Sequence, residues 1–392
     1  MSELSALAEV LRAYPDFALL TPVWPDGAKF GGEFIQGRVQ AYEMAGLRGT
    51  VIDYSSRVPD ELSLSLHPGF AHVHMHPKLL RPAVRQLSAG SAPVLAHSPT
   101  SDLQNLLVDY LPGERLAVWY HGYEVRDYRR LHYNDTTVQL AQVKQSRDAL
   151  NASRFAAARR IFKHPGATVV FVSQFQRGVS EVDVGATCSR VEIIPNHIDG
   201  DMYRGRLREP SESKSILVMR AFTARNYGND IALKAIRLLS TRRGFGELSF
   251  TISGFGPLFQ KKVDMVRHLP NVHAREAYSR PIEMASLHYD HGIFLCPSRF
   301  DTHGVMLGEA MSSGMATVTN AVAAIPEFTD SSASVLVKPD DPIAFADGLW
   351  HLIENPELLP VLSRNAMARV AAQCSREQTV DREIAIIRQL GA

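Results

Sequence analysis

The sequence has few cysteines and no long hydrophobic run. Its three cysteines, Cys188, Cys296 and Cys374, are widely spaced. This excludes a disulfide framework or a cysteine zinc site and is typical of a reducing compartment. No stretch approaches the roughly 18 uninterrupted apolar residues of a membrane-spanning helix. The first residues carry charges where a secretion signal would be apolar. We therefore expect a cytoplasmic protein and leave a peripheral membrane contact open.

The sequence also lacks an excess of charge of either sign. Its 42 Lys and Arg against 41 Asp and Glu give a formal net charge of +1, so the total gives no support to nucleic-acid binding. Basic residues do gather locally, and we interpret them as a solvated helix face, with contact to an anionic surface as the alternative. They are Arg126, Arg129, Arg130, Arg154, Arg159, Arg160 and Lys163.

A complete glycine fingerprint for a dinucleotide is missing as well. Ser253–Pro257 reads SGFGP, which has two glycines but not the third. No strand is followed by the full pattern with an acidic residue about 20 positions on, which argues against an NAD-dependent oxidoreductase.

Short apolar runs alternate with longer amphipathic stretches, which indicates βα units around parallel sheets. At 392 residues the chain can form two domains, each of roughly 150–200 residues. In the first half we predict helices at 33–45, 78–87 and about 137–162. The strands predicted there are 17–21, 50–53, 70–74, 94–97, 116–120, 168–172 and 191–194.

A second series of βα units follows the polar segment GRLREPSESKS, residues 205–215, which we predict to be a linker. Helices are expected at about 229–242, 257–268, 304–312 and 342–354. The strands predicted here are 215–219, 248–253, 272–274, 293–297, 316–319 and 334–337. The prediction is an α/β protein with two doubly wound, Rossmann-like domains at 1–200 and 201–375. A C-terminal helix within 376–392 is expected to pack back on the first domain.

The most informative segment is FLCPSRFDTHGVMLGEAMSSG, residues 294–314. A buried strand ends before a polar loop that contains Asp301, and a helix begins near Gly304 with Glu309 about two turns inside. The two carboxylates are then on the order of 10 Å apart, comparable to the distance from the hexose to the ribose of a nucleotide sugar. Between them, the N–H groups at the helix start favour an anion such as the diphosphate.

This segment resembles the paired-carboxylate signature of the family-four retaining GT-B glycosyltransferases, an acidic residue followed eight positions later by Glu. The resemblance implies two Rossmann-like domains facing each other across a donor cleft. It also implies that Asp301 contacts sugar hydroxyls and that Glu309 binds the ribose, with His303, Gly304 and Val305 in the donor site. The sequence departs from the family with Asp301 in place of the usual Glu and His303 where an aromatic residue is common.

Further positions extend the resemblance. Arg220 and Arg225, five apart after a predicted strand, are similar to the family's Arg and Lys that neutralise the diphosphate without a metal. Gly254 lies in a turn similar to the family's Gly-x-Gly-Pro turn near the nucleotide. The pair Gly31–Gly32 precedes a helix, where backbone approaches a phosphate closely.

Histidines follow two strands of the first half. His121 comes directly after the strand 116–120 and resembles the family's active-site histidine, which hydrogen-bonds to the transferred sugar. A structural histidine is the alternative. His72, His74 and His76 alternate on one strand face; we interpret them as structural or acceptor-site residues and not as metal ligands.

Together these features predict a metal-independent, retaining transferase without a cofactor. It would move a hexose-type sugar from a nucleotide sugar to a hydroxyl of a glycan, lipid-linked or small-molecule acceptor in surface polysaccharide or glycoconjugate synthesis. Front-face retention needs no carboxylate nucleophile, and the sequence offers no convincing one. Two alternatives stay open: a sugar-nucleotide epimerase or phosphorylase on the same fold, and a non-catalytic GT-B partner subunit.

Overall fold

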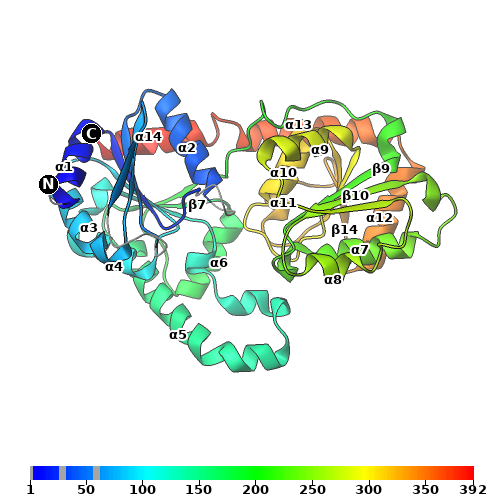
Figure 1. Ribbon diagram of the computed structural model, residues 1–392, viewed down its shortest axis with the longest axis horizontal. Helices are drawn as coiled ribbons and strands as arrows, with labels where there is room; N and C mark the ends of the chain where they lie inside the picture. The colour runs from blue at the N-terminus through cyan, green and yellow to red at the C-terminus, as the bar shows by residue number, and fades with distance from the viewer. Residues whose placement is uncertain (1–2, 26–31, 56–61) are drawn as a thin grey trace. The chain divides into compact units, whose positions relative to one another are not determined.

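The computed structural model describes residues 3–25, 32–55 and 62–392, which form two compact units (Figure 1). The first unit comprises Met1–Arg130, Ala141–Ile194 and Thr379–Ala392, and the second comprises Leu131–Leu140 and Pro195–Gln378. The chain therefore passes from one unit to the other at four places. None of the helices within the described ranges is long and apolar enough to span a membrane.

The first unit is built on a sheet in the order β3-β4-β2-β1-β5-β6-β7-β8. All neighbours are parallel except β3 and β4. The strands are β1 (Phe17–Thr21), β2 (Gly49–Asp53), β3 (Ser63–Leu66), β4 (Phe70–His74), β5 (Val94–His97), β6 (Leu116–Tyr120), β7 (Thr168–Phe171) and β8 (Val191–Ile193). The strand order reverses between β1 and β5. The edge strand β3 was not predicted, because all four of its residues are exposed and it has no buried apolar run.

Helices cover both faces of this sheet. They are α1 (Glu3–Ala13), α2 (Glu33–Met44), α3 (Leu80–Ser88), α4 (Ser101–Tyr110), α6 (Gln174–Val184), α14 (Val380–Leu390) and most of α5 (Thr137–Phe162). The prediction did not include α4 and α6, although each begins at a capping residue. The Thr100 hydroxyl accepts from the N–H of Leu103, and the Ser173 hydroxyl accepts from the N–H of Gln176.

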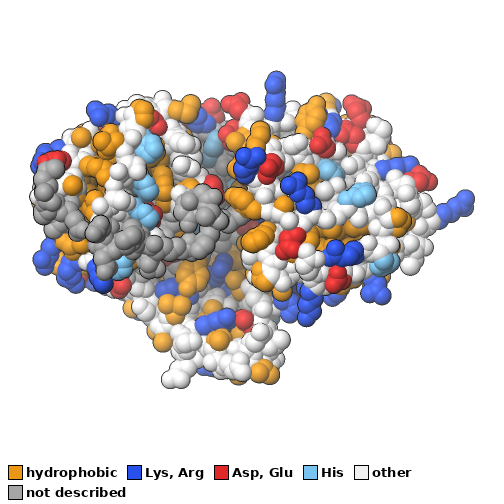
Figure 2. All heavy atoms as spheres, viewed as in Figure 1, with side chains coloured by type: hydrophobic (Ala, Val, Ile, Leu, Met, Phe, Trp, Pro, Cys, Tyr) orange, Lys and Arg blue, Asp and Glu red, His pale blue; other side chains and the backbone are white. Residues whose placement is uncertain are grey.

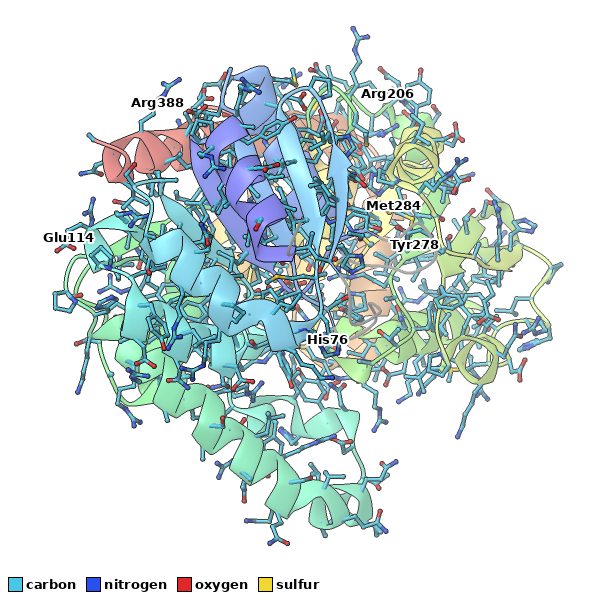
Figure 3. All side chains as sticks on the ribbon, turned by 60° about the vertical axis from the view of Figure 1, so that its left-hand side comes forward. His76, Glu114, Arg206, Tyr278, Met284 and Arg388 are labelled. Carbon is cyan, nitrogen blue, oxygen red and sulfur yellow. The ribbon has the colours of Figure 1, made fainter. Side chains whose placement is uncertain are left out.

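The C-terminal helix α14 packs against α2 within the first unit. Arg38 Nε of α2 donates to Glu383 Oε1 at 3.0 Å, and both side chains are buried. The Tyr42 hydroxyl donates to the other carboxylate oxygen of Glu383. Arg388, on the same helix, is exposed and points outward (Figure 3). A buried, hydrogen-bonded charge pair therefore fixes this helix to the unit that also contains the N-terminal strands.

The second unit has a parallel sheet in the order β11-β10-β9-β12-β13-β14. Its strands are β9 (Ser215–Met219), β10 (Ser249–Gly254), β11 (Val272–Glu276), β12 (Ile293–Leu295), β13 (Ala316–Asn320) and β14 (Val335–Val337). Its helices are α7 (Asn229–Leu239), α8 (Phe259–Val263), α9 (Pro281–Asp290), α10 (Val305–Ser312), α11 (Ile325–Phe328), α12 (Pro342–Glu354) and α13 (Leu358–Cys374). Figure 1 shows α13 above this sheet and α7 and α8 below it. Both units are thus doubly wound and Rossmann-like.

The linker prediction for residues 205–215 is wrong. This segment lies inside the second unit, and the chain leaves the first unit earlier, between Ile194 and Pro195. The side chain of Arg208 is fully buried and donates to the carbonyl groups of His288, Tyr289 and Ser313. A polar segment is buried here because its donors find carbonyl acceptors that are distant in sequence.

Candidate functional site

The site in the second unit lies where the strand order reverses, between β9 and β12. In doubly wound sheets, ligands bind at this point, beyond the carboxyl ends of the strands. Arg220 directly follows β9, and Asp301 lies in the loop after β12. Arg220 Nη2 is 3.4 Å from Asp301 Oδ2 and also donates to the Ser298 hydroxyl. The topology therefore brings together two residues that are 81 positions apart.

Arg220 is buried, with only 5 % of its side chain exposed. Its Nε is buried and has no hydrogen-bond partner among the described residues. The guanidinium also lies over the Tyr227 ring, at 5.4 Å from the centroid. A buried cation with an unused donor is suited to an anionic ligand that accepts from more than one N–H.

The Asp301 carboxylate also orders the start of helix α10. Its Oδ1 accepts from the backbone N–H groups of His303 and Gly304, at 3.2 and 2.8 Å. Gly304 has φ 82°, and a Cβ there would lie 2.7 Å from Ile325 Cδ1. Only glycine meets both conditions without strain.

Helix α10 begins at Val305, directly after this turn. The N–H groups of Val305 and Met306 have no acceptor within the residues that the structure describes. They lie at the positive end of the helix, on the loop that contains Asp301. Together with the cationic Arg220, they form an arrangement that favours a diphosphate.

Glu309 lies about one turn inside α10 and not two as predicted, because the helix begins only at Val305. It is close enough to Arg220 for their charges to interact. Burial raises the pKa of Glu309 to about 7, although a hydrogen bond from Tyr203 and the positive charge of Arg220 act in the opposite direction. Burial and the nearby carboxyl group likewise raise the pKa of Tyr203. Arg220, Asp301 and Glu309 therefore form one cluster, to which the structure adds Tyr203 and Ser298.

The ring of His303 lies in the protein interior. Its Nδ1 is 3.2 Å from the side-chain amide of Asn196, and its Nε2 is 3.5 Å from the Cys374 sulfur. The ring also packs edge-on against Phe328, with centroids 4.1 Å apart. Its backbone N–H is the group that reaches Asp301. The His303 side chain therefore anchors the Asp301 loop to the protein interior.

Arg225 is not part of the Arg220 cluster in this structure. It begins a short turn, Arg225–Tyr227, and its guanidinium donates to the carbonyl of Tyr133 at 3.2 Å. The turn is joined to the Asp301 loop by Arg299, whose backbone N–H donates to the Asn226 carbonyl at 2.8 Å. The Arg299 guanidinium forms a bidentate pair with Asp230. The turn is therefore held firmly beside the cluster.

Gly254 is the last residue of β10 and packs against the backbone of Arg220. A Cβ at this position would lie 2.1 Å from the Arg220 carbonyl oxygen and 2.7 Å from the Phe222 ring. The Gly254 carbonyl accepts from Ala277 N at 3.0 Å. The absence of a side chain at Gly254 thus allows the segment after β9 to pack closely against the end of β10.

In the first unit, His121 and Gly32 lie beyond the carboxyl ends of the parallel strands. Gly32 is the residue before α2 and has φ 96°, and a Cβ there would lie 2.7 Å from Trp24 backbone atoms. Its predicted partner Gly31 is outside the described residues. His121 Nε2 is 3.2 Å from Nδ1 of His97, the last residue of β5.

His121 and His97 are both neutral. Burial lowers the pKa of His121 to about 3, with a smaller contribution from the positive charge of Arg38, and burial also lowers the pKa of His97. Glu124 accepts from the N–H groups of His121 and Gly122, which fixes the turn after β6. A neutral imidazole suits hydrogen bonding to a hydroxyl better than proton transfer near pH 7.

The alternating histidines of β4 have separate surroundings. His72 stacks on Trp24, and burial lowers its pKa to about 4. His74 pairs with Asp53 at 3.2 Å, and His76 Nδ1 accepts from Lys78 N. Figure 2 shows a column of histidine side chains on the visible face of this unit. Among the described residues, no group of three His, Cys, Asp or Glu side chains could hold a metal ion.

The local basic residues of the first unit bond within the protein. Arg130 pairs with Asp183, Arg129 with Asp127 and Arg160 with Asp109. Arg154 is buried and donates to the carbonyl groups of Tyr123 and Arg126. These pairs reduce the net positive charge of this surface, and the buried Arg154 does not fit the interpretation as a solvated helix face.

The sequence analysis did not identify several residues around Arg220 and His121: His97, Glu124, Tyr203, Ser298 and Arg299. His97 could have been identified from the sequence, because it is the last residue of a predicted strand, just as His121 directly follows one. Arg299 lies in the segment 294–314 that was singled out, but only the tertiary structure shows that it bonds to the Arg225 turn. The contact of Tyr203 with Glu309 likewise follows from the tertiary structure alone.

Comparison with known proteins agrees with this geometry. Residues 213–355 match the family model described as Glycosyl transferases group 1. This match contains Arg220, Gly254, Asp301 and Glu309. No curated protein sequence matches the chain.

Solved structures match nearly the whole chain. Sucrose-phosphate synthase from Thermosynechococcus elongatus has a TM-score of 0.70 at 14% identity, covering 95% of this chain and 98% of that one. WaaG, a glycosyltransferase involved in lipopolysaccharide biosynthesis, has 0.66 at 14% identity, covering 95% and 99%. Anabaena HepE in complex with UDP has 0.65 at 14% identity, covering 94% and 98%. At these identities the likeness establishes the fold, which is GT-B.

Proposed function

We propose that this protein is a retaining glycosyltransferase of family four, which moves a hexose-type sugar from a nucleoside diphosphate to an acceptor hydroxyl. The observation that supports it best is the cluster at the β9/β12 reversal. There a buried guanidinium with an unused Nε–H, the Asp301 and Glu309 carboxyl groups and the start of α10 lie together. The group 1 domain match over 213–355 supports the same chemistry.

In this proposal the diphosphate binds to Arg220 and to the free N–H groups of Val305 and Met306. These groups stabilise the negative charge that develops on the leaving phosphate, which is the main electrostatic demand of the reaction. They are fixed in place before the donor arrives, since Arg220 is held by Ser298 and Asp301. Arg225, on the adjacent turn, adds a second positive charge.

Glu309 accepts hydrogen bonds from the ribose hydroxyls, and Asp301 contacts the transferred sugar. In Asp301, Oδ1 is occupied by two backbone N–H groups, whereas among the described residues Oδ2 contacts only Arg220, at a long distance of 3.4 Å. A carboxylate oxygen has two lone pairs, so Oδ2 is the atom that can accept from a sugar hydroxyl. By its resemblance to the family's active-site histidine, neutral His121 would hydrogen-bond to the transferred sugar.

Transfer then occurs on one face of the sugar. The bond between the anomeric carbon and the phosphate oxygen breaks, the acceptor oxygen bonds to that carbon from the same side, and its proton passes to the leaving phosphate. No protein carboxylate forms a covalent bond in this scheme. The acceptor is a glycan, a lipid-linked saccharide or a small alcohol.

A nucleotide-release assay over a panel of nucleotide sugars, with and without candidate acceptors, tests the proposal. Acceptor-dependent release supports transfer, and the anomeric configuration of the product, read by NMR, reports retention. Conversion of the donor alone would instead identify an epimerase. If Glu309→Ala left donor affinity and turnover intact, the site would be wrongly assigned.

A further inference from the structure

One short segment groups with the second unit although the residues on both sides of it belong to the first. This segment is Leu131–Leu140. Asn134 Oδ1 accepts hydrogen bonds from the backbone N–H groups of Arg225 and Asn226, at 2.8 and 3.1 Å. With the bond from Arg225 to the Tyr133 carbonyl, three hydrogen bonds join the segment to the Arg225–Tyr227 turn. The two partners are about 90 residues apart in the sequence.

Local hydrogen-bonded structure precedes and follows Asn134. The preceding short helix, Tyr128–Asn134, contains a kink at Leu131, which has non-helical φ and ψ angles. The chain enters the second unit at this kink. After Asn134, the Thr136 hydroxyl accepts from Gln139 N and the Gln139 side chain accepts from Thr136 N, which forms a capping box at the start of α5. Asn134 therefore lies between two ordered segments, the short helix before it and the capping box after it.

The turn that Asn134 contacts needs such support, because positive groups crowd around it. Burial lowers the pKa of Lys262, and the nearby positive charges of Arg225 and Arg299 lower it further. Arg299 is compensated by Asp230 and Asp340. Asn134 contributes two accepted hydrogen bonds without adding charge, so it stabilises the turn and leaves its positive potential for an anionic ligand.

Arg299 holds the same turn from the other side. Its guanidinium donates to the Arg225 carbonyl at 2.8 Å and lies over the Tyr133 ring, at 5.9 Å from the centroid. The turn is therefore bonded through its N–H groups to Asn134 and through its carbonyl groups to Arg299. The Arg225 side chain uses one donor for Tyr133 and has others to offer a phosphate oxygen.

We propose that Asn134 is a positioning residue of the donor site, which acts through the Arg225 turn to place Arg225 for the diphosphate. The proposal deepens the proposed function and rests on it. Loss of both accepted hydrogen bonds should allow the turn to fluctuate and weaken diphosphate binding by about tenfold. The segment Leu131–Leu140 would then be a functional part of the donor domain, although it ends about 75 residues before that domain's first strand, β9.

The test uses the full chain, four single variants and one double variant. Asn134→Ala removes the acceptor, and Asn134→Asp keeps an acceptor oxygen. Asn365→Ala is the matched control, because the Asn365 side chain also bonds to backbone of the second unit, where it donates to the Ser332 carbonyl. The fourth variant, Arg225→Ala, is studied alone and combined with Asn134→Ala. Hydrogen exchange of the peptide over 224–228 and the affinity for UDP, GDP, ADP, CDP and TDP are measured for each.

We expect faster exchange at 224–228 and about tenfold weaker binding of the preferred nucleotide in Asn134→Ala, with recovered exchange protection in Asn134→Asp and no change of either in Asn365→Ala. In the Arg225→Ala background, Asn134→Ala should add little further loss. Unchanged exchange, unchanged affinity or full additivity would each overturn the positioning role. If the wild-type protein bound none of the five nucleotides, the proposed function would fail and this role with it. Normal wild-type binding with no effect of Asn134→Ala would refute the role alone.

Discussion

Arg220 and Asp301 meet at the strand-order reversal of the second sheet, with Nη2 and Oδ2 3.4 Å apart. Each residue follows a different central strand, so the fold itself sets their spacing. The same carboxylate orders the start of α10, and the same guanidinium retains an unused Nε–H. A donor therefore meets a site whose charges are already oriented, which lowers the cost of binding and of stabilising the leaving group.

Replacing Arg220 should affect catalysis more than stability. We expect Arg220→Ala to lower kcat/KM by about 100-fold or more, because the leaving diphosphate loses its buried cation. Arg220→Lys should recover part of this loss, since it keeps the charge but not the planar fork. The measurement is steady-state nucleotide release.

Arg237→Ala is the matched control for this prediction, because Arg237 is an exposed residue of α7. It should retain wild-type kcat/KM. Equal activity of Arg220→Ala and Arg237→Ala would mean that Arg220 does not contact the diphosphate.

The raised pKa of Glu309 predicts that donor affinity depends on pH. Only the ionised carboxylate accepts from both ribose hydroxyls, and burial raises its pKa to about 7. Affinity for the preferred nucleoside diphosphate should therefore fall by about tenfold from pH 8 to pH 6. Isothermal titration at several pH values measures this. Glu309→Gln should bind more weakly at pH 8 and lose this part of the pH dependence.

The Glu309 carboxyl group also makes the stability of the nucleotide-free protein depend on pH. A folded-state pKa above the usual 4.5 means that the folded protein holds a proton which the unfolded chain releases between these values. The contribution is fully present below pH 4.5 and is lost as the pH rises through about 7, amounting to about 3 kcal/mol. Denaturant unfolding of Glu309→Gln should lack this loss; parallel pH profiles of the two proteins would contradict the assignment.

Gly254 should tolerate no side chain. In Gly254→Ala the new Cβ would clash with the Arg220 carbonyl, so we expect a loss of about 1–3 kcal/mol of stability and weaker nucleotide binding. Thermal unfolding and titration measure the two effects. At Gly246 a Cβ would meet nothing within 4 Å, so Gly246→Ala should be close to neutral in both measurements. Identical behaviour of the two variants would show that the segment after β9 packs less closely against Gly254 than the structure indicates.

The C-terminal helix should depend on its buried charge pair. Glu383→Ala leaves Arg38 buried without its carboxylate, which is expected to cost about 3–5 kcal/mol. Glu377→Ala, near the helix but exposed, serves as the control. Urea unfolding followed by circular dichroism gives both values, and a cost below about 1 kcal/mol for Glu383→Ala would contradict the burial of the pair.

The sequence predicted most of the sheet strands and the position of the second-unit cluster for the same reason. Buried parallel strands are continuous apolar runs, so their ends, and the residues after them such as Arg220 and His121, can be located from the sequence. The rule that ligands bind beyond strand ends then selects these residues.

Other features depend on partners that the sequence does not reveal. Arg208 reads as part of a polar linker, and only the carbonyl groups around it explain its burial. His303 fits a donor loop by its position, yet Asn196 and Cys374 hold its ring in the interior. Arg225 is placed by Asn134 from a segment that no local pattern connects to it.

The most direct test is a crystal structure of the full chain with its preferred nucleoside diphosphate. The account predicts phosphate oxygens within hydrogen-bonding distance of Arg220 Nε and of the N–H groups of Val305 and Met306, and ribose hydroxyls on the Glu309 carboxylate. A diphosphate bound elsewhere, with Arg220 contacting only Ser298 and Asp301, would contradict it.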